Sequence, residues 1–249
     1  GELEQHEADL ALAIQKVTEE VVIKMAKTAK QLTGAKSICL AGGVALNCVA
    51  NGKLQNEGIF EDVYIQPAAG DAGGSVGSAL AAHHIYFDKD RVNENPDSMS
   101  GAYLGPEYHP IDVQRGLKKF RAVYSEFTGD DLYPKVAELL DEGNVVGWFQ
   151  GRMEFGPRAL GARSIIADPR RVDMQKKLNL KIKYRESFRP FAPSVLAEHA
   201  SDYFELESDS PYMLLVQPVV DSRREKLPKG YNALPLRKKL AVKRSDLPA

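Results

Sequence analysis

The sequence predicts an α/β protein with two parts. In residues 1–95, segments with helical spacing of apolar residues alternate with short apolar runs that end at glycine-rich turns. This order is typical of helices packed against a mostly parallel sheet. A polar segment without periodicity, residues 88–100, leads into a second part, residues 96–249, which contains a strongly basic stretch. A length of 249 residues allows two ordinary domains.

The first part is expected to order its elements as helix, strand, helix, strand and helix. Apolar residues recur at helical spacing from the start, and Gly34 is suited to end a long first helix. Each strand is a short apolar run that meets a tight turn. In chain order, we expect one long helix, or two helices in line, over residues 3–33, a strand over 37–41, a helix over 45–56, a strand over 62–66 and a helix over 75–86.

The second part is expected to mix amphipathic helices with two strands. Gly143 ends one helix, and Pro218 interrupts the second strand, which suits an edge position. No core pattern is recoverable after residue 220. In chain order, we expect helices over residues 112–120 and 131–142, a strand over 145–149, a helix over 173–182 and a strand over 212–220.

Composition excludes several broad classes. The net charge of −1 gives the whole chain no field that would attract nucleic acid or a membrane surface. No apolar run approaches the roughly 20 residues that a membrane span needs, and the n-region and h-region pattern of a signal peptide does not occur in these residues. Cys39 and Cys48 both fall in segments expected to be buried, which favours reduced thiols over a disulfide. We therefore expect a cytoplasmic protein.

Residues 151–193 concentrate seven arginines and four lysines against four acidic residues. Two interpretations are open: a solvated helix with its flanks, or a pocket for a small anion. Arg158 and Arg189 each adjoin a proline, and guanidinium groups on rigid loops suit phosphate or carboxylate. Lys183 would reach the same pocket if the preceding helix pointed inward. The residues expected to face solvent instead are Arg170, Arg171, Lys176 and Lys177.

Two glycine-rich turns follow the expected strands of the first part. Such turns present backbone N–H groups at a helix start, where phosphate binds readily, although each is also compatible with an ordinary tight turn. The aspartate in the second turn suits a metal ion that bridges phosphates, or a helix cap. Together the turns predict a nucleotide site at one edge of a sheet. The residues concerned are Gly42, Gly43 and Asn47 of GGVALN, and Gly70, Asp71 and Gly73 of GDAGG.

Four motifs in this order resemble the O-carbamoyltransferases of nodulation-factor and antibiotic biosynthesis. They are GGVALN, GDAGG, GRMEFGPRALGARSIIADPR and YRESFRPFAP, and the resemblance as a whole extends over residues 38–193. The arginine-rich motif is specific to that family, whereas GGVALN is shared with actin-like ATPases and with threonylcarbamoyl enzymes that modify tRNA.

The resemblance implies an actin-like, sugar-kinase-type ATPase domain, of which residues 1–95 are the C-terminal part, followed by a YrdC-like domain over residues 96–249. It implies ATP and a divalent metal ion, iron or magnesium, as cofactors. Carbamoyl phosphate would yield carbamoyl-adenylate, and the carbamoyl group would pass to a hydroxyl of a small-molecule acceptor. The implied nucleotide contacts are Gly42, Gly43, Asn47, Gly70 and Gly73, the metal ligand is Asp71, and the carbamoyl phosphate ligands are Arg158, Lys183 and Arg189.

The sequence departs from the family pattern at two places. The family has a His-x-x-x-His pair that completes the metal site, and no such spacing occurs here. It also has an Asn-Thr-Ser-Phe-Asn type motif beyond this C-terminus. We therefore expect an internal fragment, truncated in its second domain and inactive alone. The acceptor is not indicated, and homo-oligomerisation is left open.

Two rival functions are compatible with parts of the sequence. A threonylcarbamoyl enzyme that modifies tRNA would share only the glycine turns. A non-catalytic module that binds anions or nucleic acid would need only the basic stretch. Nucleic-acid grooves combine basic residues with stacking aromatic residues, which are few in this stretch. We therefore expect neither nucleic acid nor a membrane as a partner.

Overall fold

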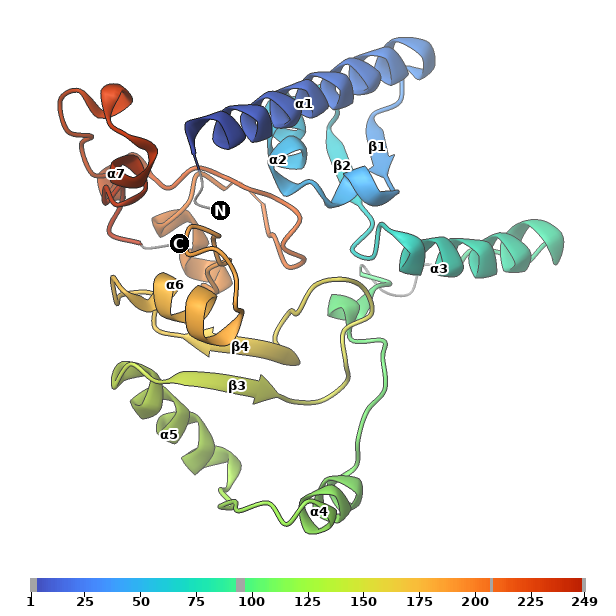
Figure 1. Cartoon of the computed structure of the whole chain (residues 1–249). Coiled ribbons are helices and arrows are strands. Elements are labelled where there is room, and N and C mark those ends of the chain that lie inside the picture. Colours follow the sequence, from blue (N-terminus) through green and yellow to red (C-terminus); the bar gives the residue numbers. More distant parts are fainter. Residues whose placement is uncertain (1–3, 93–96, 207, 248–249) are drawn as a thin grey trace. The chain divides into compact units, whose positions relative to one another are not determined.

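The computed structural model describes residues 4–92, 97–206 and 208–247 (Figure 1). The described residues form two compact units, one of residues 4–92 with 194–206 and 208–247 and the other of residues 97–193. These units do not follow a single linear division near residue 95, because Ser194–Leu247 packs with the first unit. The expected linker, residues 88–100, includes residues 93–96, which lie outside the described residues.

The first unit has the predicted order of elements. They are α1 (Gln5–Thr33), β1 (Ser37–Leu40), α2 (Cys48–Asn56), β2 (Asp62–Ile65) and α3 (Asp71–Ala81). β1 and β2 are parallel, as expected, with Leu40 opposite Ile65. The second helix differs from the prediction because a 3₁₀ turn, Gly43–Leu46, precedes it, and α3 begins earlier and continues as a π-helical turn, Ala82–Tyr86.

Local chemistry explains the two ends of α1. At its start, the backbone N–H of Glu4 donates to Glu7 Oε2 at 3.0 Å as part of a capping box. At its end, Gly34 has φ of 64° and its N–H donates to the carbonyl oxygen of Lys30 at 2.9 Å. This left-handed residue is the helix end that the sequence predicts.

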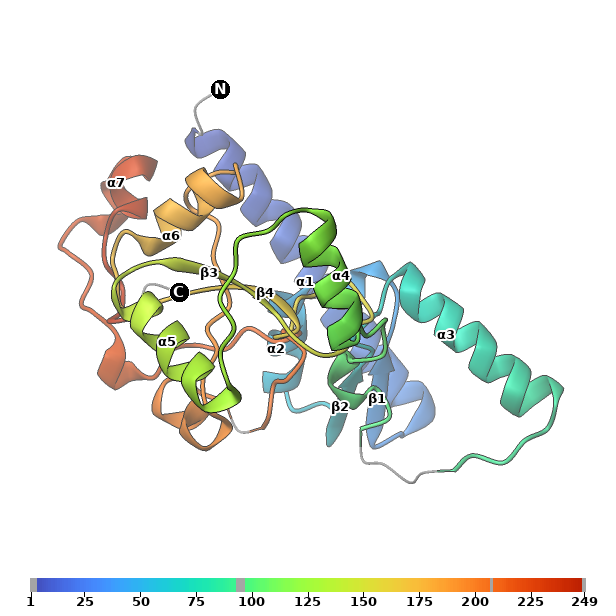
Figure 2. The same cartoon turned by 90° about the horizontal axis from the view of Figure 1, so that it is seen from below.

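The core of the first unit lies between the helices and the strands. One cluster joins Ala26 of α1 and Leu54 of α2 with Phe60, and the strand residues pack against it. Cys39 is exposed and Cys48 is half-buried, so the expectation that both thiols are buried is wrong. Alternate side chains of the short strand β1 face outward, which explains the exposure of Cys39. None of the α3 residues is buried, and this helix extends away from the strands of its unit (Figures 1 and 2).

The C-terminal segment returns to α2. Asn51 of α2 is buried, and its Nδ2 donates to the carbonyl oxygen of Leu214 at 3.0 Å. A Cβ on Gly52 would lie 2.2 Å from the carbonyl oxygen of Val216. The strand expected over residues 212–220 does not form, because the backbone of this segment bonds to α2 and makes only an isolated bridge, Phe204↔Val219.

The second unit packs helices beside an antiparallel pair of strands. Its elements are α4 (Pro110–Lys119), α5 (Gly129–Asp141), β3 (Val145–Phe149), β4 (Arg163–Ala167) and α6 (Met174–Lys177), which continues as a π-helical turn, Leu178–Ile182. β3 pairs with β4. β4 was not predicted from the sequence, because its apolar run is short and begins at an arginine.

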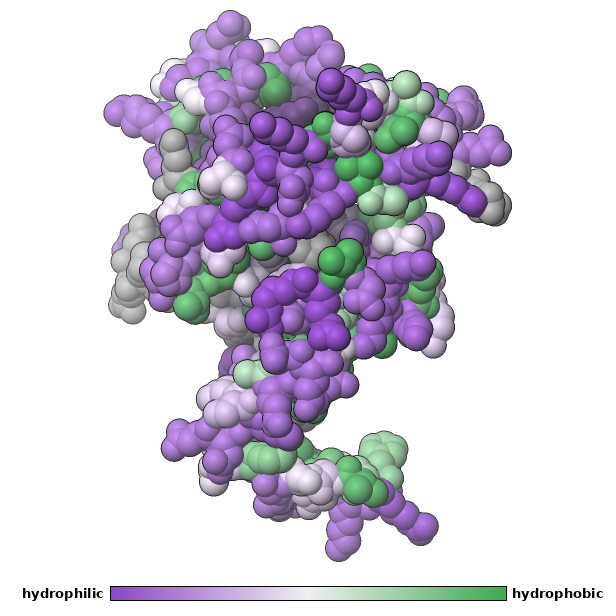
Figure 3. All heavy atoms as spheres, turned by 90° about the vertical axis from the view of Figure 1, so that its left-hand side faces the viewer, coloured by the Kyte–Doolittle hydropathy of each residue, from purple (hydrophilic) through white to green (hydrophobic). Residues whose placement is uncertain are grey.

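The face drawn in Figure 3 is mainly hydrophilic, with apolar side chains among the polar ones. Met174 and Leu178 are buried on the inner side of the α6 segment, whereas Ile182 is 42% exposed. Among the described residues, no helix combines the length and the apolar character needed to cross a membrane.

Candidate functional site

The two glycine-rich turns meet at one edge of the β1–β2 pair. The strands end side by side, with Leu40 opposite Ile65. The Gly42 N–H donates to the carbonyl oxygen of Ala69 at 2.7 Å and so joins the first turn to the second. This is the common edge that the sequence predicts. The expected nucleotide and metal residues that lie in these two turns are Gly42, Gly43, Gly70, Asp71 and Gly73.

Backbone packing accounts for two of these glycines. Gly42 has φ of 94°, a conformation that strains L-residues with a side chain. At Gly73, a Cβ would lie 2.3 Å from the carbonyl oxygen of Ala68, and the Gly73 N–H donates to that oxygen at 2.7 Å. A Cβ at Gly43 would meet no atom within 4 Å. Gly42 and Gly73 therefore serve the turns themselves, whether or not a ligand binds there.

Asn47 is the N-cap of α2 and also connects α2 to α1. Its Oδ1 accepts a hydrogen bond from the backbone N–H of Ala50 at 3.1 Å, and its Nδ2 donates to Gln15 Oε1 at 3.0 Å. Gln15 Nε2 lies 3.2 Å from Asn47 Oδ1, so the two amides pair reciprocally. A ligand that contacts the Asn47 amide would compete with these bonds.

Gln15 leads to a buried carboxylate that the sequence analysis missed. Glu19 is 6% exposed, accepts a hydrogen bond from Gln15 Nε2 at 2.8 Å and pairs with Lys53 of α2. The hydrogen bond from Lys53, with that from Gln15, outweighs desolvation and lowers the pKa of Glu19. A row of hydrogen-bonded polar side chains thus connects α1 to α2 and ends at Asn47. The only sequence signal is that Glu19 shares a helix face with Ala26.

Asp71 lies in the first turn of α3 with its side chain exposed. Gly70 is the N-cap, so Asp71 occupies the first helical position and not the cap position. Within the described ranges, no group of three or more His, Cys, Asp and Glu side chains is placed to hold a metal ion.

In the second unit, Glu154 closes the loop that carries Arg158. Glu154 Oε1 accepts hydrogen bonds from the backbone N–H groups of Leu160 at 2.6 Å, Ala162 at 2.8 Å and Arg163 at 3.3 Å. Partial burial acts to raise the pKa of Glu154, but these backbone donors outweigh it and hold the pKa below its usual value. Arg158 lies between these attachment points and is half-buried. Glu154 therefore shapes the loop, a role that the sequence analysis did not assign.

Two amide side chains hold the loop that carries Lys183 and Arg189. Asn179 is fully buried, and its Nδ2 donates to the carbonyl oxygen of Arg189 at 2.8 Å, while its Oδ1 accepts from Arg185 Nε at 2.6 Å. Gln175 Nε2 donates to the same Arg189 carbonyl at 3.0 Å. Neither amide was predicted as a structural residue, because an amide within a helix carries no local sign of its burial.

Lys183 and Arg189 themselves have exposed side chains. Arg189 Nε donates to Glu186 Oε2 at 2.7 Å. An ion pair between exposed groups contributes little free energy, so a multivalent anion can compete with Glu186 for this arginine. Lys183 follows the π-helical turn, and its backbone N–H donates to the carbonyl oxygen of Leu178 at 2.9 Å.

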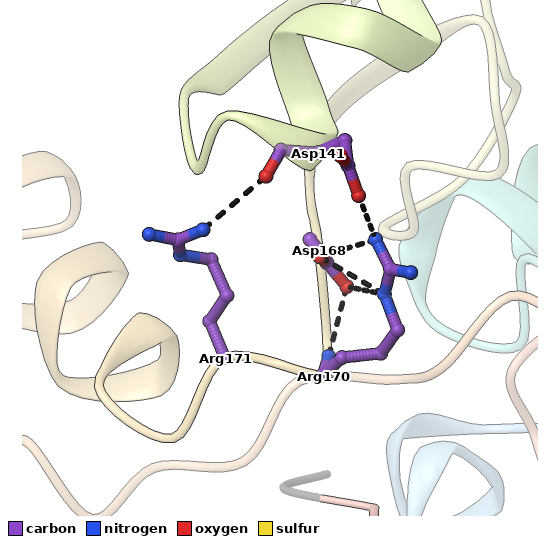
Figure 4. A network of polar contacts seen from close by, with 4 residues as sticks. All are labelled: Asp141, Asp168, Arg170 and Arg171. Atoms are coloured by element: carbon purple, nitrogen blue, oxygen red, sulfur yellow. Dashed lines mark hydrogen bonds and ion pairs between the residues drawn. The ribbon is translucent and has the colours of Figure 1, made fainter.

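Arg170 and Arg171 connect the end of β4 to the end of α5 (Figure 4). Asp168 is 7% exposed and accepts from Arg170 Nε at 2.9 Å and Nη2 at 2.8 Å, and the same Nη2 reaches Asp141 Oδ1 at 2.6 Å. Arg171 Nη1 donates to the Asp141 carbonyl oxygen at 3.2 Å. The hydrogen bonds from Arg170 outweigh burial and lower the pKa of Asp168. Both arginines are exposed, as expected, but they also stabilise the scaffold.

The basic stretch therefore separates into scaffold residues and the two loops with the expected anion ligands. Each scaffold residue bonds to another part of its own unit. These residues are Arg152, Arg170, Arg171, Lys177 and Arg185. The loops contain Arg158, Lys183 and Arg189, as the sequence predicts, and Arg163 directly follows the first of them.

Two family models match this chain. Residues 2–80 match the family model of the carbamoyltransferase N-terminus, and residues 137–233 match that of the carbamoyltransferase C-terminus. The chain belongs to the carbamoyltransferase family. The first match includes both glycine-rich turns, and the second includes both basic loops and the segment that packs on α2.

Relatives in this family align over most of the chain. The uncharacterized protein sll1178 of Synechocystis sp. is 55% identical over 249 residues, which are 99% of this chain and 40% of that protein. Nodulation protein NolNO of Sinorhizobium fredii is 40% identical over 90% of this chain and 33% of its own length. Nodulation protein NolO of Bradyrhizobium diazoefficiens is 38% identical over 89% of this chain and 40% of its own length. The chain thus spans about two fifths or less of these relatives.

Proposed function

We propose that this chain provides nucleotide-binding turns and carbamoyl phosphate-binding loops of an ATP-dependent O-carbamoyltransferase. The observation that carries the proposal is the match to both carbamoyltransferase family models, in chain order, over the glycine-rich turns and over the basic loops. In this proposal the first part belongs to an actin-like ATPase domain and the second to a YrdC-like domain. The carbamoyl group passes through carbamoyl-adenylate to a hydroxyl of a small-molecule acceptor.

For the nucleotide, we assign Gly42, Gly43, Asn47, Gly70 and Gly73 to contacts with ATP. Support comes from the meeting of both turns at one sheet edge, where open α/β sheets bind ligands, and from the N-terminus of α3 beside it. Mg²⁺ commonly binds through one or two carboxylates together with substrate phosphates. The exposed Asp71 carboxylate in the first turn of α3 suits that mode better than a cage made only of protein groups.

For carbamoyl phosphate, we assign Arg158, Lys183 and Arg189. The phosphate is a small dianion, and preorganised cationic donors stabilise both its charge and the charge that develops during transfer. Support comes from how the loops are built: Glu154 fixes the backbone around Arg158, and Asn179 with Gln175 fixes the backbone at Arg189. The charged groups are thus carried by two loops whose backbones are held by other residues.

Binding is tested by the thermal stability of the purified chain with carbamoyl phosphate, inorganic phosphate or a short oligonucleotide. We expect carbamoyl phosphate to raise the Tm and Arg158→Ala to abolish the shift. Arg115→Ala, which removes an exposed arginine from α4, is the matched control and should keep the shift. An oligonucleotide that stabilises the chain more than carbamoyl phosphate, with affinity falling steeply as salt rises, would instead identify a nucleic-acid-binding module.

Turnover is tested with the complete gene product, by mass spectrometry of carbamoyl transfer to candidate sugar hydroxyls. Asp71→Ala should remove the ATP- and metal-dependent activity while the circular dichroism spectrum stays unchanged. Asp62→Ala at the start of β2 is the control, because Asp62 is an exposed carboxylate at the opposite end of the strand. Full activity of Asp71→Ala would contradict the metal assignment.

A further inference from the structure

Arg163, the first residue of β4, is held in one orientation by its surroundings. It lies opposite Phe149 in the β3–β4 register, and its guanidinium carbon is 3.5 Å from the centre of the Phe149 ring. Its Nη1 donates to the carbonyl oxygen of Ala162 at 2.9 Å, and its backbone N–H donates to Glu154 Oε1 at 3.3 Å. Stacking on an aromatic ring and a backbone hydrogen bond together restrict the side chain before any ligand binds.

Two nitrogens of this fixed guanidinium make no hydrogen bond with the described residues. Nε and Nη2 of Arg163 are both buried, and neither has a hydrogen-bond partner among the described residues. Arginine stays protonated in proteins, so these are charged donors removed from water without compensation. Leaving such a group unsatisfied is strongly unfavourable, because the lost hydration is not replaced. Two unsatisfied donors on one side chain therefore indicate a partner that the polypeptide itself does not supply.

Other arginines of the same chain show which groups bind the Nε/Nη2 edge of a guanidinium. Nε and Nη2 lie side by side on a guanidinium and form a fork for two oxygen atoms. Arg170 applies this fork to the Asp168 carboxylate at 2.9 Å and 2.8 Å (Figure 4). The Nε atom is also bonded in Arg185, Arg189, Arg223 and Arg224. Arg163 presents the same fork without an oxyanion.

We propose that the Nε/Nη2 edge of Arg163 binds two oxygens of a phosphoryl group, that of carbamoyl phosphate. This inference rests on the proposed function and extends it to a residue that does not belong to the three assigned anion ligands. Arg163 directly follows the Glu154-closed loop that carries Arg158, so both arginines belong to one short segment.

The loop itself provides a way for the anion to reach the buried edge. Because Nε and Nη2 are covered, part of the chain around them must move when the ligand enters. Gly151, Gly156 and Gly161 of the β3–β4 loop have φ of 53°, 123° and 109°. Glycine changes between such backbone conformations at low steric cost, so these positions can act as pivots.

The test follows the Nε–H signal of Arg163 by NMR while inorganic phosphate, carbamoyl phosphate or ATP is added to the purified chain. The signal is identified by its absence in Arg163→Lys and, independently, by its ring-current change in Phe149→Leu, should the first variant fold poorly. We expect carbamoyl phosphate and inorganic phosphate to shift this signal. Arg163→Lys keeps the charge but loses the fork, and should weaken carbamoyl phosphate binding about tenfold or more. Arg115→Lys is the control.

The outcomes separate this inference from the proposed function. If carbamoyl phosphate raises the Tm but leaves the Arg163 signal unmoved, the donor-binding proposal stands and the Arg163 assignment is overturned. If inorganic phosphate moves the signal but carbamoyl phosphate neither binds nor shifts it, a phosphoryl site exists and the proposed donor is wrong. A shift with ATP alone would overturn the assignment to the small donor. A lower Tm of Arg163→Lys without ligand, with unchanged affinity, would reduce Arg163 to a structural role.

Discussion

The glycine-rich turns of the first unit and the basic loops of the second differ in how they divide structural and chemical tasks. In the turns, the groups expected to meet a ligand already serve the fold: the Gly42 N–H bonds to Ala69, and the Asn47 amide caps α2. In the basic loops, the backbone is held by Glu154 and Asn179 instead.

This difference affects how far a ligand role can be inferred from residue type. A glycine in a turn has a sufficient explanation in backbone geometry, so its presence adds little support for phosphate binding. A buried guanidinium nitrogen without a hydrogen-bond partner among the described residues, as in Arg163, has no such explanation. Arg163 therefore gives stronger support to the proposed ligand role than Gly42 or Gly73 does.

The largest effect is expected from Gly73→Ala, which tests whether the turns depend on their glycines for folding. The new Cβ would lie 2.3 Å from a backbone oxygen that cannot move without breaking the turn. We expect a loss of about 2 kcal/mol or more in the free energy of unfolding, because overpacking against backbone is costly. Urea denaturation followed by circular dichroism measures it.

Gly74→Ala is the matched control, since a Cβ there would meet no atom within 4 Å. It lies in the same helix turn and should be neutral or stabilise the protein by about 0.5 kcal/mol. Equal stability of the two variants would remove the packing explanation of Gly73 and leave close approach to a ligand as the reason for glycine.

A smaller effect is expected from Glu154→Gln. This variant tests whether the loop that carries Arg158 needs the Glu154 carboxylate to keep its conformation. An amide oxygen accepts the three backbone hydrogen bonds less strongly than a carboxylate does, so we expect a loss of about 1–2 kcal/mol at pH 7. Amide hydrogen exchange of Leu160 and Ala162 should become faster. Glu138→Gln, which changes an exposed carboxylate on α5, should have almost no effect.

The difference in stability between the wild type and Glu154→Gln should depend on pH. The pKa of Glu154 is lowered in the folded protein, so its contribution is fully present above the unfolded pKa near 4.3 and is lost as the pH falls through the lower folded pKa. The stability difference between the wild type and Glu154→Gln should therefore shrink as the pH falls below about 4. A difference that stays constant from pH 7 to pH 2 would contradict the carboxylate role.

The sequence predicts the local parts of this structure well. The order from α1 to α3 and the parallel pairing of β1 with β2 follow from apolar periodicity and from turn residues, which act over a few positions. The match to carbamoyltransferases likewise follows from short motifs. The nucleotide and carbamoyl phosphate roles stay predictions.

The parts that the sequence does not predict depend on contacts between distant positions. The bond from Asn51 to Leu214 joins residues 163 positions apart, and neither residue has a neighbour that signals it. The return of Ser194–Leu247 to the first unit is of this kind. Asn179 and Glu154 were missed for a related reason, because their partners are backbone groups, which every residue type carries.

The smallest effect is expected from substitution of Asn47, which tests whether its side chain in the first turn serves the fold or contacts the nucleotide. Asn47→Ala removes the N-cap bond to Ala50 and the pairing with Gln15, and should cost about 1 kcal/mol. Asn47→Asp keeps a cap acceptor and should recover most of that loss. If ATP stabilises the wild type and Asn47→Asp equally but fails to stabilise Asn47→Ala, the cap alone supports the nucleotide turn. If ATP stabilises neither variant, the amide nitrogen itself meets the ligand, and the glycine-rich turns would then combine structural and chemical tasks in one side chain.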